Sequence, residues 1–290
     1  MPSLRDIKRR IASVKNTQQI TNAMKMVSAA KLQRAQDRVM AARPYAERMQ
    51  IVVEHLQARV RSAAHPLLTP RAEGKTLLLV NTSDRGLCGG FNATVQRAAA
   101  EKIRELGGGE QVDIIAVGKK GRDFLTFRQF TLRETYLDMF TRQVAYAQAQ
   151  EVAEKLLTAY EQEGYRQVLV IYNRFRSAMV QQVTILRLLP LSTVEDVEAE
   201  PEEPFDYLYE PSASHVLDHL LRKQIEVQLY QVFLESFAGE HGARMTAMDS
   251  ATENASEMIA SLTLTYNRAR QAAITKELIE VVSGADALTT

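Results

Sequence analysis

The residues with the most scope for chemistry lie in a glycine-rich segment at 83–92, which reads SDRGLCGGFN. The segment follows an apolar run and precedes a helical pattern, and the N-terminus of a helix can bind phosphate. It lacks both the Gly-Lys-Ser/Thr ending of a P-loop and the G-x-G-x-x-G spacing of dinucleotide-binding folds. We therefore favour a tight connection between a strand and a helix, in which glycine supplies positive φ angles.

Two further sets of side chains could act as a nucleophile or bind a metal. Cys88 is the only cysteine, and only His55 and His65 lie within fifty residues of it, so we favour a packing role. His215 and His219 have the i, i+4 spacing of a metal pair, but no third ligand is evident. We therefore expect no catalytic residues, no cofactor and no metal site. A single cysteine also excludes an intrachain disulfide and fits a reducing compartment.

The composition is that of an ordinary soluble protein. The chain has 290 residues, 46% of them apolar and 24% charged, and this length can bury a sizeable core. Its apolar runs are too short to cross a bilayer, and no apolar stretch follows the basic start. We expect a chain that faces the cytosol.

A long helix is predicted at the start of the chain, over residues 1–61. Apolar residues recur there at alternating steps of four and three from Ile7, which is the pattern of a coiled-coil seam. Pro44 is expected to kink or loosen the helix.

The seam turns polar between Gln18 and Ser28, where an apolar face formed by Ile20, Met24 and Val27 lies to one side. We interpret this as a lapse of the seam and contact with a different partner.

A second long helix is predicted over residues 212–286. The same stepping from Val216 gives a seam that includes Met258, Thr265 and Ala272. A helix of this length runs roughly 100 Å and has no core of its own. We therefore pair the two terminal helices as an antiparallel coiled coil.

The middle of the chain, residues 75–190, is predicted to be a small α/β domain of βαβ type. Residues 75–83 and 112–118 are apolar runs typical of strands that are buried on both faces. Helices are expected at about 92–106 and 142–163, and an antiparallel strand pair at 167–175 and 179–189. Residues 191–211 are interpreted as an acidic connector.

Charge is unevenly distributed. Residues 1–61 contain 13 Lys and Arg against 4 Asp and Glu. Such a segment can bind nucleic acid, an anionic membrane or an acidic protein face, or it can be a solvated helix surface. It contains only one aromatic residue, Tyr45, which argues against nucleic acid because no stacking platform is available.

Four motifs in this order resemble the gamma subunit of F-type ATP synthases. They are residues 20–27 (ITNAMKMV) with 30–32, the 83–92 segment, residues 206–211 (DYLYEP), and residues 266–285, which nearly match the family signature. The resemblance spans residues 4–288. It implies a non-catalytic rotor whose shaft turns in a hexamer of alternating alpha and beta subunits, while its body rests on the membrane ring and binds the epsilon subunit.

The resemblance also implies roles for particular residues. The rotor–stator contacts would be Met24 and Lys25 on the first helix and five residues on the second: Arg244, Arg270, Gln271, Thr275 and Glu280. Tyr207 and Glu210 would lie at the foot, near the membrane ring and epsilon. One copy per complex is implied, peripheral to the cytoplasmic face of a bacterial plasma membrane. The short connector has no cysteine, so no thiol regulation is expected.

Two other hypotheses remain at this point. A coiled-coil scaffold or nucleic-acid tether with an α/β module explains the basic helix but not the four motifs. A nucleotide-binding enzyme that uses residues 83–92 lacks catalytic side chains.

Overall fold

The computed structural model describes residues 3–59, 65–141, 143–191, 210 and 212–289. The chain divides into two compact units, Met1–Val27 with Met245–Thr290, and Ser28–Arg244. Each unit is described by itself. The predicted connector, apart from Leu191 and Glu210, lies outside the described residues, and this includes Tyr207.

The unit Ser28–Arg244 is built on a five-stranded mixed sheet in the order β3-β2-β1-β4-β5. The strands are β1 (Thr76–Asn81), β2 (Val112–Val117), β3 (Leu132–Tyr136), β4 (Gln167–Phe175) and β5 (Gln181–Leu189). The first four are parallel, and β5 pairs antiparallel with β4. The predicted βαβ unit and the antiparallel strand pair are confirmed.

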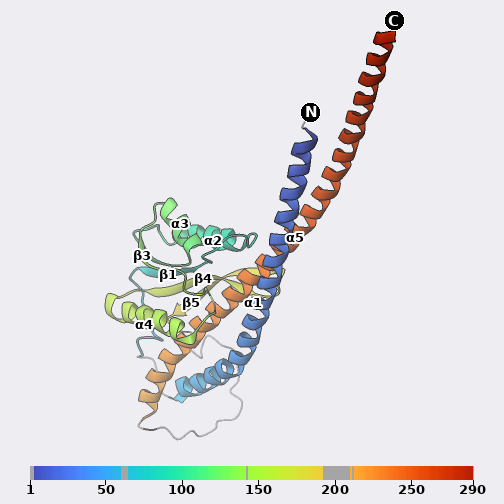
Figure 1. Cartoon of the computed structure of the whole chain (residues 1–290). Helices are drawn as coiled ribbons and strands as arrows, with labels where there is room; N and C mark the ends of the chain where they lie inside the picture. The colour runs from blue at the N-terminus through green and yellow to red at the C-terminus, as the bar shows by residue number, and fades with distance from the viewer. Residues whose placement is uncertain (1–2, 60–64, 142, 192–209, 211, 290) are drawn as a thin grey trace. The chain divides into compact units, whose positions relative to one another are not determined.

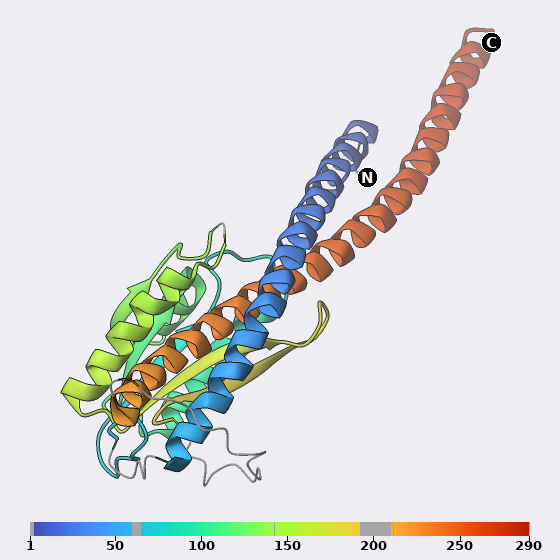
Figure 2. The same ribbon diagram turned by 90° about the horizontal axis from the view of Figure 1, so that it is seen from below.

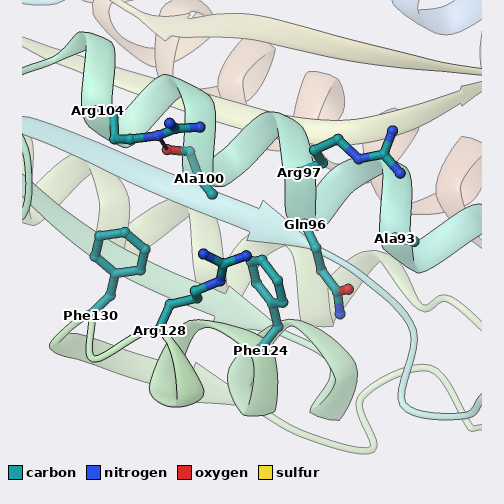
Figure 3. A pocket seen from close by; sticks show the side chains of 8 residues that line it. All are labelled: Ala93, Gln96, Arg97, Ala100, Arg104, Phe124, Arg128 and Phe130. Carbon is teal, nitrogen blue, oxygen red and sulfur yellow. Dashed lines mark hydrogen bonds between the residues drawn. The ribbon is translucent and has the colours of Figure 1, made fainter.

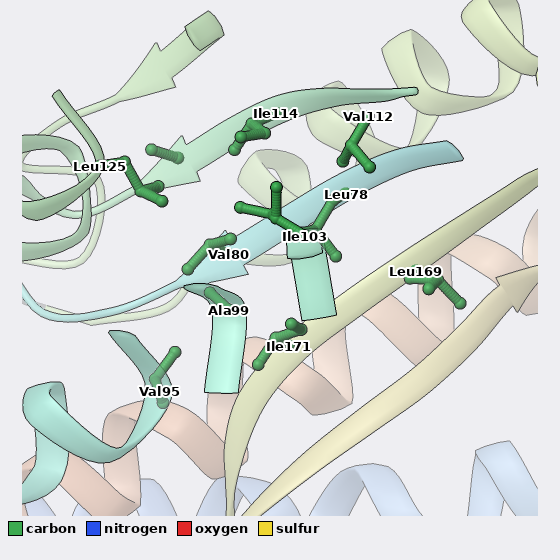
Figure 4. Close-up of a cluster of buried hydrophobic side chains, with 11 residues drawn as sticks. Leu78, Val80, Val95, Ala99, Ile103, Val112, Ile114, Leu125, Leu169 and Ile171 are labelled. Carbon is green, nitrogen blue, oxygen red and sulfur yellow. The ribbon is translucent and has the colours of Figure 1, made fainter. Parts of the chain in front are cut away.

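Helices α2 (Phe91–Glu105) and α3 (Lys119–Phe127) cover one face of the sheet (Figure 1). Their inward side chains and alternate residues of the strands form a buried apolar cluster (Figure 4). Val95 is fully buried there together with Leu78 and Ile171. Burying a large aliphatic side chain contributes about 1.5–3 kcal/mol, so this cluster fixes the two helices on the sheet.

The opposite face of the sheet is covered by α4 (Tyr146–Glu163) and by the first part of α5 (Ala213–Thr289) (Figure 1). Contacts tie these two helices together: Tyr146 donates to Glu226, and Arg222 pairs with Glu161 at 2.6 Å. Because β1 and β4 are covered on both faces, their residues are apolar at nearly every position and not at alternate ones. Helix α5 is therefore part of the core of the α/β unit as well as one of the two long helices.

The sequence-based prediction missed two elements and misplaced some boundaries. Helix α3 and strand β3 were not predicted, because both are short and β3 is a polar edge strand that is only half buried. Helix α4 begins at Tyr146 and not at 142, and β5 begins at Gln181 and not at 179. Helix α1 (Leu4–Arg59) continues through Pro44.

In the unit Met1–Val27 with Met245–Thr290, α1 and α5 pack together as antiparallel helices. Polar contacts between described side chains link them: Gln18 to Ser256 at 2.7 Å, Thr21 to Thr252 at 2.7 Å, and Lys25 to Asp249 at 2.5 Å. The residue numbers rise along α1 and fall along α5, which confirms the antiparallel pairing. By this register, the start of α1 lies opposite about residue 270 of α5, and α5 runs on beyond it (Figures 1 and 2).

The predicted lapse of the seam is wrong. Thr21 and Ser28 are buried, and the polar stretch of α1 bonds to α5 through side chains and not through apolar packing. The apolar face beside it is real, since Ile20 and Val27 are exposed at 60% and 58%. A polar seam was overlooked because the template for a coiled coil scores only apolar residues.

The predicted seam of α5 is right at every second position beyond Met248 and one residue early at the others. Ala255 is buried, and Leu262 and Ala269 are half buried, as predicted. Met258, Thr265 and Ala272 are exposed, and the half-buried residues are the next ones along the chain: Ile259, Tyr266 and Ala273. Steps of four and three can be taken in either order, and an alanine-rich helix gives little apolar contrast with which to choose between them.

Candidate functional site: the glycine-rich loop and the two long helices

The glycine-rich loop is closed by its own side chains. Asn92 accepts a hydrogen bond from the backbone N–H of Ser83 at 2.9 Å, and its amide nitrogen lies 2.8 Å from the Ser83 hydroxyl. The Asp84 carboxylate accepts bonds from two backbone amides, those of Lys119 and Asp138, both at 3.0 Å. These groups hold the loop against the start of α3 and the segment after β3. Their hydrogen-bonding capacity is therefore already used within the protein.

The backbone of the loop has the positive φ angles that the sequence indicated. Gly89 has φ 54°, and Leu87 has φ 62° although it carries a side chain. A left-handed conformation costs a non-glycine residue roughly 1–2 kcal/mol. The predicted tight connection between β1 and α2 is thus confirmed.

Cys88 is buried within this loop, as a packing residue would be. The Asn92 amide donates to its sulfur at 3.2 Å, and only 2% of the residue is exposed. Burial raises the pKa of the thiol, which lowers the fraction of the reactive thiolate near neutral pH.

A group of charged side chains on α5 lies beside the loop. Arg244 pairs with Glu240 at 2.7 Å and donates to the carbonyl oxygen of Gly86 at 3.2 Å. Burial raises the pKa of Glu240, although Arg244 opposes the shift. Burial, together with the charge of Arg244, lowers the pKa of His241 to about 3, so this imidazole is neutral at physiological pH.

The residues expected to contact the stator differ in how they are placed. Met24 is half buried on α1 and Lys25 pairs with Asp249. Arg244 is buried. The remaining residues on α5 are all exposed: Arg270, Gln271, Thr275 and Glu280. The carboxylate of Glu280 lies 3.6 Å from the ammonium of Lys276. Glu210 is exposed.

The polar partners of the seam were missed by sequence reasoning. Asp249, Thr252 and Ser256 face α1 and bond to it. Their spacing of three and four residues matches that of Gln18, Thr21 and Lys25. Reading the two polar series together would have predicted the pairing.

A basic hollow of about 440 Å³ lies between α2 and α3 (Figure 3). Arg128 lies over the ring of Phe124 at 5.5 Å, and Arg104 donates to the carbonyl oxygen of Ala100. The lining contains neither a carboxylate nor a nucleophile: Ala93, Gln96, Arg97, Ala100, Arg104, Phe124, Arg128 and Phe130. The hollow therefore offers cations and rings for binding but no group for acid–base or nucleophilic chemistry.

Within the described ranges, no three His, Cys, Asp or Glu side chains lie close enough together to hold a metal ion. Among the helices of those ranges, none has both the length and the hydropathy needed to cross a bilayer.

The fold and these sites define a class of protein, an α/β body that carries two long antiparallel helices. Residues 3–288 match the family described as ATP synthase. The ATP synthase gamma chain of Trichlorobacter lovleyi is 51% identical over 289 residues, which cover 99% of each chain. The chain belongs to the ATP synthase gamma-chain family, and it is the central-stalk rotor subunit, which is non-catalytic.

Solved structures of the same kind of protein have a similar fold. The match in the central stalk and c-ring structure of the Tetrahymena thermophila mitochondrial ATP synthase has a TM-score of 0.60 and 26% identity, and covers 80% of this chain and 99% of that one. A chain of the Euglena gracilis mitochondrial enzyme has a TM-score of 0.67 with 20% identity, and the match covers 98% of this chain and 94% of that one.

Proposed function

We propose that this chain couples rotation of a membrane ring to conformational cycling of catalytic beta subunits. The end of α5 would turn inside a hexamer of alternating alpha and beta subunits, which hold the nucleotides. A shaft that contacts three equivalent sites differently shifts the conformational equilibrium of each site by a different amount. Rotation would then drive the sites through their states in sequence.

The observation that carries this proposal is the apolar surface at the end of α5. Beyond about residue 270, where the register with α1 ends, large apolar side chains are 49–70% exposed: Ile274, Leu278, Ile279, Val281 and Val282. Apolar side chains concentrated on one helical end indicate a surface that a partner covers. An apolar tip also suits a bearing, because apolar contacts are non-directional and slide without breaking hydrogen bonds.

The stator contacts are proposed at Met24, Lys25 and Arg244, and at the exposed residues of α5. Those are Arg270, Gln271, Thr275 and Glu280. Met24 lies between the exposed side chains of Ile20 and Val27 on α1. The surplus of positive charge over residues 1–61 suits acidic loops on the beta subunits.

The body is proposed to bind the epsilon subunit and to rest on the c-ring of the membrane sector. Tyr207 and Glu210 would form part of that foot. One copy of the chain would serve each complex, peripheral to the cytoplasmic face of a bacterial plasma membrane.

Single-molecule rotation tests the proposal. Glu101→Cys on the exposed side of α2 places a thiol on the body, and the buried Cys88 should not compete for label. In the complete complex, fixed by its stator, a probe on this thiol should rotate in one direction when ATP is added. Hydrolysis of ATP by a complex whose probe stays still would contradict the proposal.

A further inference from the structure

The order of the strands defines a particular position at one edge of the sheet. From β1 the chain proceeds through β2 to β3 on one side, whereas β4 lies on the other side of β1. In open α/β sheets, ligands bind outside the carboxyl ends of the strands at the point where the order reverses. Here that point lies between the glycine-rich loop, which follows β1, and the hairpin that joins β4 to β5.

In this protein, α5 packs against both of these segments. A Cβ added at Gly239 would lie 3.2 Å from the ring of Phe91 and 3.3 Å from the side chain of Gln181. One added at Gly242 would lie 3.1 Å from the Cα atom of Ala178. The two glycines therefore allow the helix to approach the loop and the hairpin more closely than a side chain would permit.

Polar contacts fix the same stretch of helix. The Arg244 guanidinium bonds to the Gly86 carbonyl oxygen and to Glu240, and only 6% of the residue is exposed. Asn173, at the end of β4, is fully buried and donates to the carbonyl oxygen of Phe91 at 2.7 Å. The loop is thus held from two sides, by β4 and by α5.

We infer that residues 239–244 of α5 occupy, as an internal ligand, the position where other open α/β sheets bind a small molecule. In this arrangement Arg244 positions the glycine-rich loop on the helix. This inference rests on the proposed function, since it assigns the way in which the body grips the shaft. The guanidinium reaches Gly86 and Glu240 at once, because its donors form a fixed fork. Torque applied to the sheet is passed to α5 at this contact.

Arg244 then has a role inside the chain. A residue that only touches the stator would leave the motion of the glycine-rich loop unchanged when it is replaced. A residue that holds the loop on α5 changes that motion, and local opening of a segment is measured directly by amide hydrogen exchange.

The test compares Arg244→Met with Arg166→Met in the complete complex. Arg166 is exposed at the start of β4, and it provides a matched control at the other end of the strands. In Arg244→Met we expect exchange at residues 85–91 to become about tenfold faster, the factor expected when a buried charge-assisted bond is lost, with exchange in β2 unchanged. The ratio of ATP-driven proton pumping to hydrolysis should fall several-fold. Arg166→Met should change neither quantity.

A second variant separates coupling from stability. Arg244→Met leaves Glu240 buried without its partner, whereas the double variant with Glu240→Gln removes both charges, and removal of a whole buried pair costs less stability than removal of one member. We expect the double variant to regain thermal stability but not the pumping ratio, because the Gly86 carbonyl oxygen still lacks the hydrogen bond from residue 244.

Unchanged exchange at residues 85–91 in Arg244→Met would overturn the inference, and so would a normal pumping ratio in the double variant. Absence of ATP-driven rotation in the unaltered complex would instead reject the proposed function. The exchange result does not depend on rotation, so the two failures can be told apart.

Discussion

Lys25 on α1 lies 2.5 Å from Asp249 on α5, and this ion pair closes a ladder of three polar contacts between the two helices. A polar seam aligns two helices more strictly than alanine packing does, because each hydrogen bond requires one register. The neighbouring residue Met24 lies on the side of α1 that carries exposed apolar residues. One turn of α1 therefore has an internal face and an external face.

Met24→Lys is expected to impair coupling more than assembly. The new ammonium would lie beside the acidic loops proposed for the beta subunits and form an ion pair of about 1 kcal/mol if exposed, and more if desolvated. The complex should hydrolyse ATP while pumping protons poorly, as measured by the ratio of the two rates. Asn22→Lys, an exposed position on another face of the helix, is the control. Loss of assembly, or an unchanged ratio, would show that Met24 is a packing residue.

Lys25→Met and Asp249→Asn should each destabilise the helix pair only slightly. Their side chains are 39% and 60% exposed, and an exposed pair contributes at most about 1 kcal/mol. A double-mutant cycle, followed by thermal unfolding, should give a coupling energy in that range which falls as salt is added. A coupling energy several times larger would mean that the pair is shielded from water.

Gly118→Ala should be among the most damaging substitutions in the sheet. Gly118 has φ 90°, and an added Cβ would lie 2.3 Å from the backbone oxygen of Thr82, so the strand must shift at a cost of about 3 kcal/mol or more. Gly108→Ala is a matched control, with φ 84° but open space around the added carbon, and should cost about 1 kcal/mol. Urea unfolding followed by circular dichroism measures both. Equal losses would show that conformation and not contact sets the cost.

Activity of the assembled complex should not respond to dithiol reductants. Cys88 is the only cysteine, and it is buried with a raised pKa, so it has no intrachain disulfide partner and little thiolate. Alkylation by iodoacetamide at pH 8 should be slow in the folded chain and fast after unfolding. A reversible change of activity on reduction that disappears in Cys88→Ser would contradict this expectation.

The isolated chain should neither bind ATP tightly nor hydrolyse it. The side chains of Ser83, Asp84 and Asn92 are bonded within the protein, so the loop would have to break its own contacts to accept phosphate. Titration calorimetry checks binding, and a phosphate-release assay checks hydrolysis. Micromolar affinity that is lost on Asp84→Ala would reopen the nucleotide-binding hypothesis.

The sequence by itself determined the elements whose signals are local. Apolar runs at β1 and β2, helical periodicity at both ends and glycines after β1 are each set by neighbouring residues, so periodicity and turn chemistry indicate them directly. The four motifs were enough to indicate the family. The antiparallel pairing also followed, because two long helices without a core need a partner.

Only the tertiary structure decided which faces of these helices meet. Thr21 and Thr252 are far apart in sequence, and neither is apolar, so no single-helix pattern marks them as partners. The placement of Gly239 and Arg244 against the loops that follow β1 and β4 depends on strand order, and strand order is set by packing over the whole sheet. Long-range contacts of this kind leave no period in the sequence, because the residues that make them are chosen by the shape of the opposing surface.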